Sequence, residues 1–165
     1  MICCNPKILL IGSSGQVGSA LLEILENKND ITSPENFCFL NLTTEDLEQK
    51  LSVLNPNIII NTLAYTSVDE AENDRENAFS LNTLFPANLA RWCYNNSCLL
   101  VHYSSDYVFS GKGINVRTED SDTDPINYYG LTKLKGDIAI KNSKANSIIL
   151  RCSWIYRLSH NSFLK

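Results

Sequence analysis

Three residues in the second half of the chain have the types and spacing for acid–base chemistry on a carbonyl group: Ser105, Tyr129 and Lys133. Tyr129 and Lys133 are four residues apart, so on a helix their side chains leave from the same face. A phenol with a pKa of about 10 is a poor acid–base group at neutral pH, and a neighbouring ammonium brings that pKa toward the working range. The Ser105 hydroxyl can then hydrogen-bond a carbonyl oxygen while Tyr129 donates a proton to the developing alkoxide.

Each of these residues also has a simpler interpretation. A tyrosine and a lysine at this spacing are usually packed and solvated neighbours on a helix surface, and a lone serine after a strand is usually a turn residue. Tyr128 is five residues from Lys133 and lies off the shared face. The chemical interpretation is favoured because the three residues follow, in order, a glycine-rich turn.

That turn, Gly12-Ser-Ser-Gly-Gln-Val-Gly18, follows an apolar run and opens an amphipathic stretch. Gly12 would allow a tight turn, Gly15 would let a pyrophosphate approach the backbone, and Gly18 would let a helix pack closely on a sheet. A phosphate would face the N–H groups of the helix N-terminus, where the macrodipole favours negative charge. The context favours a dinucleotide site over an ordinary strand–helix turn, and Lys133 can hold ribose hydroxyls there.

The ribose partner of such a cofactor is an acid about 20 residues further on, at the end of a second strand. The segment Ile31–Asn36 is a poor strand, since Pro34 is confined to an edge or to the end of pairing. Glu35 is the acid in this segment that can accept a hydrogen bond from a ribose 2′-hydroxyl, and no arginine lies in it to favour a 2′-phosphate. NADH is therefore slightly preferred over NADPH, and both remain open.

Short apolar runs alternate with amphipathic stretches along the chain, which predicts an α/β fold: a Rossmann-like, doubly wound parallel sheet flanked by helices. We expect a single dinucleotide-binding domain over residues 1–165. The expected strands are Lys7–Ile11, Ile58–Ile60, Leu99–Tyr103, Ile148–Cys152 and, more weakly, Phe37–Leu40; the expected helices are Val17–Leu25, Thr44–Leu54, Asp69–Asn95 with an interruption near Pro86, and Tyr128–Lys141; Gly111–Asp124 is expected to be a loop.

Composition excludes several classes of partner. A net charge of −4 over 165 residues argues against a nucleic-acid binder, which needs a basic face. The six cysteines lack paired zinc spacing, which favours reduced thiols in a cytoplasmic protein and no metal site. No apolar run approaches the roughly 20 residues of a membrane span.

Longer sequence blocks then point to one family. The most specific are His102-Tyr-Ser-Ser-Asp-Tyr-Val-Phe109, Tyr129-Gly-Leu-Thr-Lys133 and Arg151-Cys-Ser-Trp-Ile-Tyr156. With them the chain resembles the extended short-chain dehydrogenases/reductases, and among these the dTDP-4-dehydrorhamnose reductase family. The resemblance covers essentially the whole chain and implies NAD(P)H-dependent reduction of the 4-keto group of a dTDP-sugar, in dTDP-L-rhamnose biosynthesis.

The resemblance also implies roles at matching positions. Tyr129 would be the proton donor with Lys133 as its partner, and Ser105 stands where the family usually has threonine. The remaining implied contacts are Gly15, Gln16 and Val17 with the cofactor pyrophosphate, Asn41 and Leu42 near the adenine, Ala64, Tyr65 and Thr66 along the cofactor, and Ser105, Asp106 and Trp154 with the sugar nucleotide.

The chain departs from the family in three respects. Asn41 replaces a usual carboxylate, and Leu63 replaces a small residue and is expected to crowd the cofactor. Family members are roughly twice as long, and their second half supplies most of the substrate pocket. We therefore expect the C-terminal substrate domain to be absent, activity of this chain alone to be doubtful, and exposed apolar surface to favour a homo-oligomer.

A second function class stays open beside the enzyme. The same fold serves as a non-catalytic, nucleotide-binding regulatory subunit, similar to that of methionine adenosyltransferase. Cofactor binding without turnover would distinguish this alternative from the reductase.

Overall fold

The computed structural model describes residues 5–27, 30–34, 42–114 and 116–156. Within them, five parallel strands form one sheet in the order β2-β1-β3-β4-β5. Their bounds are β1 (Lys7–Ile11), β2 (Asp30–Thr32), β3 (Ile58–Asn61), β4 (Leu99–Ser105) and β5 (Ser147–Cys152). The predicted Rossmann-like α/β fold is confirmed.

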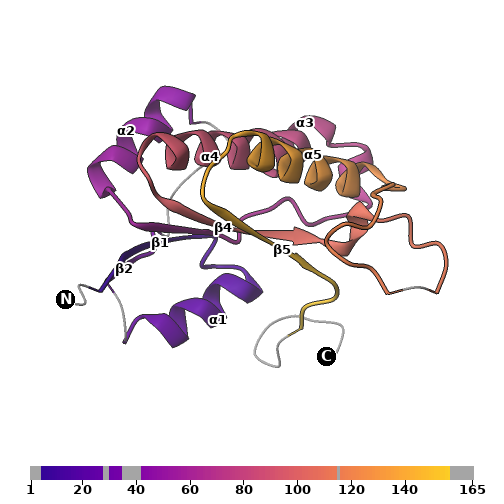
Figure 1. Cartoon of the computed structure of the whole chain (residues 1–165), viewed down its shortest axis with the longest axis horizontal. Helices are drawn as coiled ribbons and strands as arrows, with labels where there is room; N and C mark the ends of the chain where they lie inside the picture. The colour runs from indigo at the N-terminus through magenta and orange to yellow at the C-terminus, as the bar shows by residue number, and fades with distance from the viewer. Residues whose placement is uncertain (1–4, 28–29, 35–41, 115, 157–165) are drawn as a thin grey trace.

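Helices lie on both faces of the sheet (Figure 1), with α1 on one side and the other α-helices on the opposite side. None of the helices in the described residues has the length and hydropathy that a bilayer crossing demands. The α-helices are α1 (Gln16–Leu25), α2 (Thr44–Leu54), α3 (Arg75–Phe79), α4 (Phe85–Asn95) and α5 (Tyr128–Asn142); the short turns are η2 (Glu70–Glu72), the π-helical η3 (Ser80–Leu84) and η4 (Asp106–Val108).

Two predictions about these elements need correction. The segment beginning at Ile31 was expected to be a poor strand, but Ile31 and Thr32 lie in β2 and pair in parallel with Ile8 and Leu9. The ladder offered by β1 outweighs the weak local propensity, and Pro34 lies beyond the last paired residue. The expected helix Asp69–Asn95 is divided into η2, α3, η3 and α4: the predicted interruption near Pro86 is confirmed, and the break between η2 and α3 was not predicted.

The division of that helix has a physical reason near Pro86. Proline lacks the N–H that a helix interior needs, and it is tolerated in the first turn. Pro86 accordingly lies at the start of α4, and the π-helical turn η3 precedes it. The weak strand candidate Phe37–Leu40 and the predicted cofactor residues Glu35 and Asn41 lie outside the described residues.

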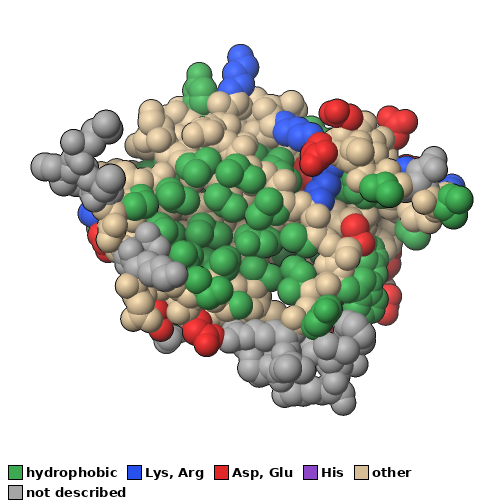
Figure 2. Space-filling view, turned by 60° about the horizontal axis from the view of Figure 1, so that its bottom comes forward, with side chains coloured by type: hydrophobic (Ala, Val, Ile, Leu, Met, Phe, Trp, Pro, Cys, Tyr) green, Lys and Arg blue, Asp and Glu red, His purple; other side chains and the backbone are tan. Residues whose placement is uncertain are grey.

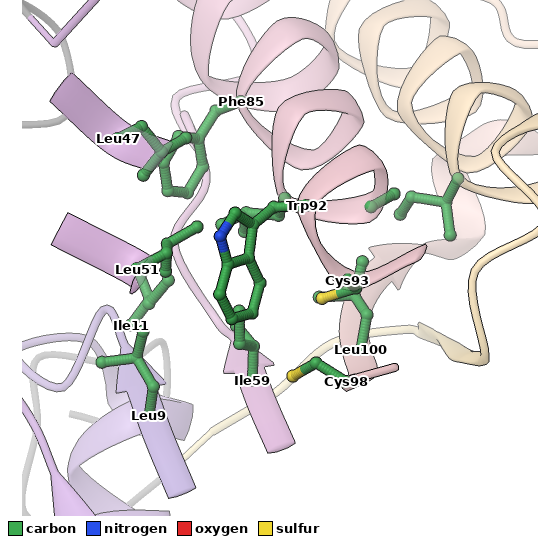
Figure 3. Close-up of a cluster of buried hydrophobic side chains, with 13 residues drawn as sticks. Leu9, Ile11, Leu47, Leu51, Ile59, Phe85, Trp92, Cys93, Cys98 and Leu100 are labelled. Carbon is green, nitrogen blue, oxygen red and sulfur yellow. The ribbon is translucent and has the colours of Figure 1, made fainter. Parts of the chain in front are cut away.

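The main core lies between the sheet and helices α2, α4 and α5. In Figure 3, Trp92 of α4 points into this core, with Ile59 of β3 beside it. Leu51 of α2 and Leu100 of β4 are fully buried in the same cluster. Burying each large apolar side chain contributes about 1.5–3 kcal/mol to the stability of the fold. This packed layer therefore holds the strands in place, and with them the carboxyl ends of the strands, where the site lies.

The opposite face of the sheet is less covered. Figure 2 shows hydrophobic side chains gathered across it. On this side, Val101 and Tyr103 of β4 are half-buried, and Ile148 and Leu150 of β5 are 47% and 38% exposed. The described helices therefore leave apolar sheet surface open next to β5.

Candidate active site

The glycine turn joins β1 to α1, and its three glycines differ in what the fold demands of them. Gly12 has φ +88°, and an added Cβ would lie 2.7 Å from the Leu63 backbone nitrogen. A Cβ on Gly18 would lie 2.1 Å from the Gly12 carbonyl oxygen. Gly15 has φ −77°, and its added Cβ would meet only that same oxygen, at 3.4 Å. Packing thus accounts for Gly12 and Gly18, and it leaves Gly15 unaccounted for.

The surroundings of Gly15 fit a phosphate-bearing cofactor. Gly15 is the N-cap of α1, and as a glycine it has no side chain to cap the first N–H groups of the helix. The positive end of the dipole of this ten-residue helix lies at the same point, which favours a phosphate there. The next side chain, Gln16, has a buried Oε1 without a hydrogen-bond partner among the described residues. Val17 follows in the first turn of α1. Leu63, which was expected to crowd the cofactor, packs against the hydrophobic core.

Polar side chains tie the segment after β3 to this turn and to α5. The Thr62 hydroxyl donates to the carbonyl oxygens of Ile11 (2.8 Å) and Gly12 (3.1 Å). The Asn82 amide accepts from the Tyr65 N–H (2.9 Å) and donates to the Tyr65 carbonyl (3.1 Å). It also donates to the Thr132 hydroxyl at 3.0 Å. Asn82 therefore joins the predicted cofactor segment Ala64–Thr66 to α5, the helix that carries Tyr129 and Lys133.

A cavity of about 230 Å³ joins five predicted site residues from four separate segments. Its lining contains Thr66 after β3, Ser105 and Asp106 at the end of β4, Tyr129 of α5, and Trp154 after β5; Val68, Tyr107 and Ser153 complete it. The carboxyl ends of parallel strands are where such folds bind ligands. The structure thus brings Thr66, one of the predicted cofactor residues, together with the catalytic candidates Ser105 and Tyr129 and the substrate candidates Asp106 and Trp154. Lys133 is not part of this lining.

Tyr129 is the ionisable group of the cavity with the most perturbed surroundings. Burial raises the pKa of the phenol, the Ser105 hydroxyl opposes this, and Asp106 raises the pKa further. The ring of Tyr107 meets it edge-on, with centroids 5.5 Å apart. The phenol is therefore held in its protonated, donating form.

Lys133 lies one helical turn after Tyr129 on α5, and it is 1% exposed. Its ammonium donates to the Tyr103 carbonyl oxygen at 2.7 Å. Burial lowers the pKa of Lys133 to about 8, against the opposing charge of Asp137. In this arrangement the ammonium is engaged by β4, and it is not among the groups that shift the pKa of Tyr129.

Four further polar residues around Lys133 were not predicted as site residues. His102 and Asn61 are fully buried and contact each other across β3 and β4, with Nδ1 and Nδ2 3.1 Å apart. Burial, then the charge of Lys133, lowers the pKa of His102 well below its ordinary range. Asp137 accepts from Arg151 at 3.0 Å. The stripe Tyr129, Lys133, Asp137 at four-residue intervals is the signal that could have found Asp137.

Leu42, another predicted cofactor residue, is half-buried and directly precedes the N-cap of α2. The N-cap Thr43 forms a capping box with Asp46. Leu42 is not among the residues that line the 230 Å³ cavity.

Comparison with known proteins decides the family. A sequence profile described as the RmlD substrate binding domain matches residues 6–165. The chain belongs to the RmlD family. The dTDP-4-dehydrorhamnose reductase of Mycolicibacterium smegmatis is 35% identical over 152 residues, covering 92% of this chain and 46% of that protein. That of Escherichia coli K12 is 34% identical, covering 96% and 54%. The chain thus spans about half the length of the curated relatives it matches.

Solved structures of other proteins have the same fold. The dTDP-4-dehydrorhamnose reductase of Bacillus anthracis, solved in complex with NADP, superposes with a TM-score of 0.90 at 31% identity, covering 97% of this chain and 57% of that one. The Bordetella bronchiseptica enzyme WbmG, solved with NAD, has a TM-score of 0.78 at 19% identity, over 91% and 54%. The second likeness concerns the fold alone.

Proposed function

We propose that this RmlD-family chain is the cofactor-binding part of an NAD(P)H-dependent sugar-nucleotide reductase. Its substrate would be dTDP-4-dehydro-6-deoxy-L-mannose, and the reaction would be reduction of the 4-keto group in dTDP-L-rhamnose biosynthesis. The observation that carries the proposal is the cavity where Thr66, Ser105, Asp106, Tyr129 and Trp154 meet. The M. smegmatis and E. coli relatives, named for this reductase, support it.

The cofactor would lie across the carboxyl ends of β1 and β3. Gly15, Gln16 and Val17 would hold its pyrophosphate, and Ala64, Tyr65 and Thr66 would line it further along. NADPH or NADH, when bound, supplies the hydride for the substrate carbon. The room left at Gly15 supports this placement, as does Gln16 Oε1, which has no hydrogen-bond partner in the part of the chain that the structure describes. The relative from Bacillus anthracis, solved in complex with NADP, also supports it.

The chain's own residues would then bind and protonate the oxygen of the substrate's carbonyl group. The Ser105 hydroxyl donates a hydrogen bond to it and fixes its position beside Tyr129. Tyr129 donates its proton as negative charge develops on the oxygen, and the raised pKa of the phenol keeps that proton available. Asp106 and Trp154 would face the sugar nucleotide, with Trp154 offering a side chain that is 69% exposed.

The test combines cofactor binding with turnover. NADPH and NADH are titrated by fluorescence, and the chain is then assayed with a dTDP-4-keto-6-deoxy sugar. Tyr129→Phe should lower turnover at least about 100-fold while leaving cofactor affinity unchanged. The neighbouring Tyr128→Phe is the matched control, because Tyr128 packs against Arg75 outside the cavity. Failure to bind either cofactor would contradict the proposal.

A non-catalytic nucleotide-binding or regulatory protein is the second candidate. The hydrogen bond from Lys133 to the Tyr103 carbonyl favours it, since the ammonium is engaged away from the phenol. Cofactor binding without turnover in the parent chain would support this candidate over the reductase.

We also propose that the chain is a single cytoplasmic domain that self-associates through the sheet face that the described helices leave open next to β5. The free, buried thiols of Cys93 and Cys98 support a reducing compartment. The exposed Ile148 and Leu150 support association, because apolar patches of this kind mark interaction sites. Light scattering should find a dimer or larger assembly that Leu150→Lys dissociates; a monodisperse monomer contradicts self-association.

A further inference from the structure

A group of buried ionisable side chains lies behind the cavity, between β4, β5 and α5. Lys133 and Asp137 are one helical turn apart on α5, and they are 1% and 0% exposed. Arg151 of β5 donates from Nε to Asp137 Oδ2 at 3.0 Å, and its side chain is 16% exposed. One buried carboxylate therefore lies with two cations near it.

The second oxygen of this carboxylate is not used by the ion pair with Arg151. Asp137 Oδ1 is buried and makes no hydrogen bond within the described residues. Burying an ammonium and a carboxylate is costly unless opposite charges compensate each other. The Lys133 ammonium makes its hydrogen bond to a neutral carbonyl, that of Tyr103, so its compensating charge must come from another group.

The other groups that face Lys133 do not supply that charge. From β4 the imidazole of His102 is neutral, because burial and Lys133 itself lower its pKa well below the ordinary range. From β5, the charge of Cys152 would also oppose loss of the Lys133 proton, but burial raises the pKa of this thiol and keeps it protonated. On α5 the Tyr129 phenol is likewise protonated. Within the described part of the chain, Asp137 is the remaining anion near the ammonium, and its charge opposes the loss of the Lys133 proton.

We propose that Asp137 is the buried counter-ion that keeps Lys133 in its ammonium form, and that Arg151 competes with Lys133 for its charge. Asp137 is then a positioning residue for the Tyr129–Lys133 pair, in addition to joining α5 to β5. Its relevance to catalysis rests on the proposed function, whereas the electrostatic coupling itself does not.

The coupling predicts opposite effects for the two ends of one ion pair. Asp137→Asn removes the counter-ion but keeps the shape of the side chain, so Lys133 should lose its proton more easily. Arg151→Gln removes the competing cation, so Lys133 should hold its proton more tightly. A purely structural ion pair predicts the same result from both variants, because each breaks the same contact.

The measurement is the titration of Lys133 by NMR in the full chain labelled with ¹³C at the lysine ε-carbons, assigned with Lys133→Arg. The parent midpoint is expected near the pKa of about 8. Asp137→Asn should lower the proton affinity at least about ten-fold, Asp137→Glu should restore it, and Arg151→Gln should raise it several-fold. Shifts of the same sign in Asp137→Asn and Arg151→Gln, or no shift in either, overturn the proposal.

Two features keep the test decisive. If Asp137→Asn does not fold, Arg151→Gln decides alone: a raised midpoint supports the coupling, and an unchanged or lowered one overturns it. Fluorescence titration with NADPH on the same samples reports separately on the proposed function, because loss of cofactor binding in the parent chain leaves the Lys133 midpoints unaffected.

Discussion

The glycine turn before α1 and the Ser105–Tyr129–Lys133 end of β4 and α5 lie at the carboxyl ends of one parallel sheet, but they are built by opposite means. The turn depends on missing side chains, since Gly12 and Gly18 allow backbone segments to meet. The triad end depends on buried polar side chains, of which Lys133 is almost completely enclosed. One region is fixed by sterics and the other by compensated charge.

Because of this difference, the two regions should respond to different perturbations, one to a change of pH and the other to an added methyl group. A change of pH leaves the glycine turn intact but alters the charge of Lys133, whose pKa is about 8. An added methyl group acts in the reverse way, because it disrupts close backbone contacts wherever they occur. Steric and titration experiments can therefore be aimed at one region at a time.

The largest effect is expected from Gly18→Ala. Its Cβ would lie 2.1 Å from the Gly12 carbonyl oxygen and 2.7 Å from the Gly12 carbonyl carbon, so the backbone of the turn must move. We expect a loss of at least about 3 kcal/mol in the free energy of unfolding, measured by urea denaturation. Ser14→Ala in the same turn is the matched control. A loss below about 1 kcal/mol would show that the turn is not held by this contact.

The glycine turn could be predicted from the sequence because its determinants are local. Gly12, Gly15 and Gly18 act within seven consecutive residues, between an apolar strand and an amphipathic helix. The same holds for Tyr129 and Lys133, whose common face follows from helical spacing. The family resemblance likewise predicted that Thr66 lines the cofactor and that Asp106 and Trp154 face the sugar nucleotide. The structure places these three residues around the same cavity.

The polar supports could not be predicted in the same way. Asn82 matters because η3 lies against both the segment after β3 and α5, and this arrangement joins residues 17 and 50 positions away. His102 is buried because α4 and α5 both pack against β4. β2 was missed for a similar reason, since its stability comes from pairing with β1. In each case the partner, which lies far along the chain, decides the role.

The second prediction concerns the charge buried at the triad end. The pKa of Lys133 is about 8 in the folded chain, below the ordinary 10.5, so between these pH values the unfolded chain binds the proton and the folded chain does not. Raising the pH through this window should therefore stabilise the fold, by about 3 kcal/mol in total. The comparison is between the parent and Lys133→Met, each unfolded with urea from pH 7.5 to 10.5. Equal pH dependence in both would mean that folding does not lower the pKa of Lys133.

The third prediction tests the link between the two regions, which Asn82 provides. Asn82→Ala removes the hydrogen bonds to both backbone groups of Tyr65 and to the Thr132 hydroxyl, and should lower the free energy of unfolding by about 2 kcal/mol. Hydrogen exchange at the Tyr65 amide should accelerate at the same time. Asn88→Ala is the control, because the side-chain hydrogen bond of Asn88 within the described residues is a long one, 3.5 Å to the Thr44 hydroxyl. Unchanged exchange at Tyr65 would mean that its segment is held by other contacts.

The smallest effect on stability, from Gly15→Ala, separates the two uses of glycine within one turn. Gly15 has φ −77° and ψ 170°, which alanine adopts freely, and the added Cβ meets one atom at 3.4 Å. The free energy of unfolding should fall by less than about 1 kcal/mol, most of it from the poorer N-cap. NADPH affinity should nevertheless fall at least about ten-fold, because the methyl group occupies the path by which a pyrophosphate approaches the helix N-terminus. Unchanged affinity in fluorescence titration would leave Gly15 without a role in either packing or binding, and would remove the steric argument for a cofactor at this turn.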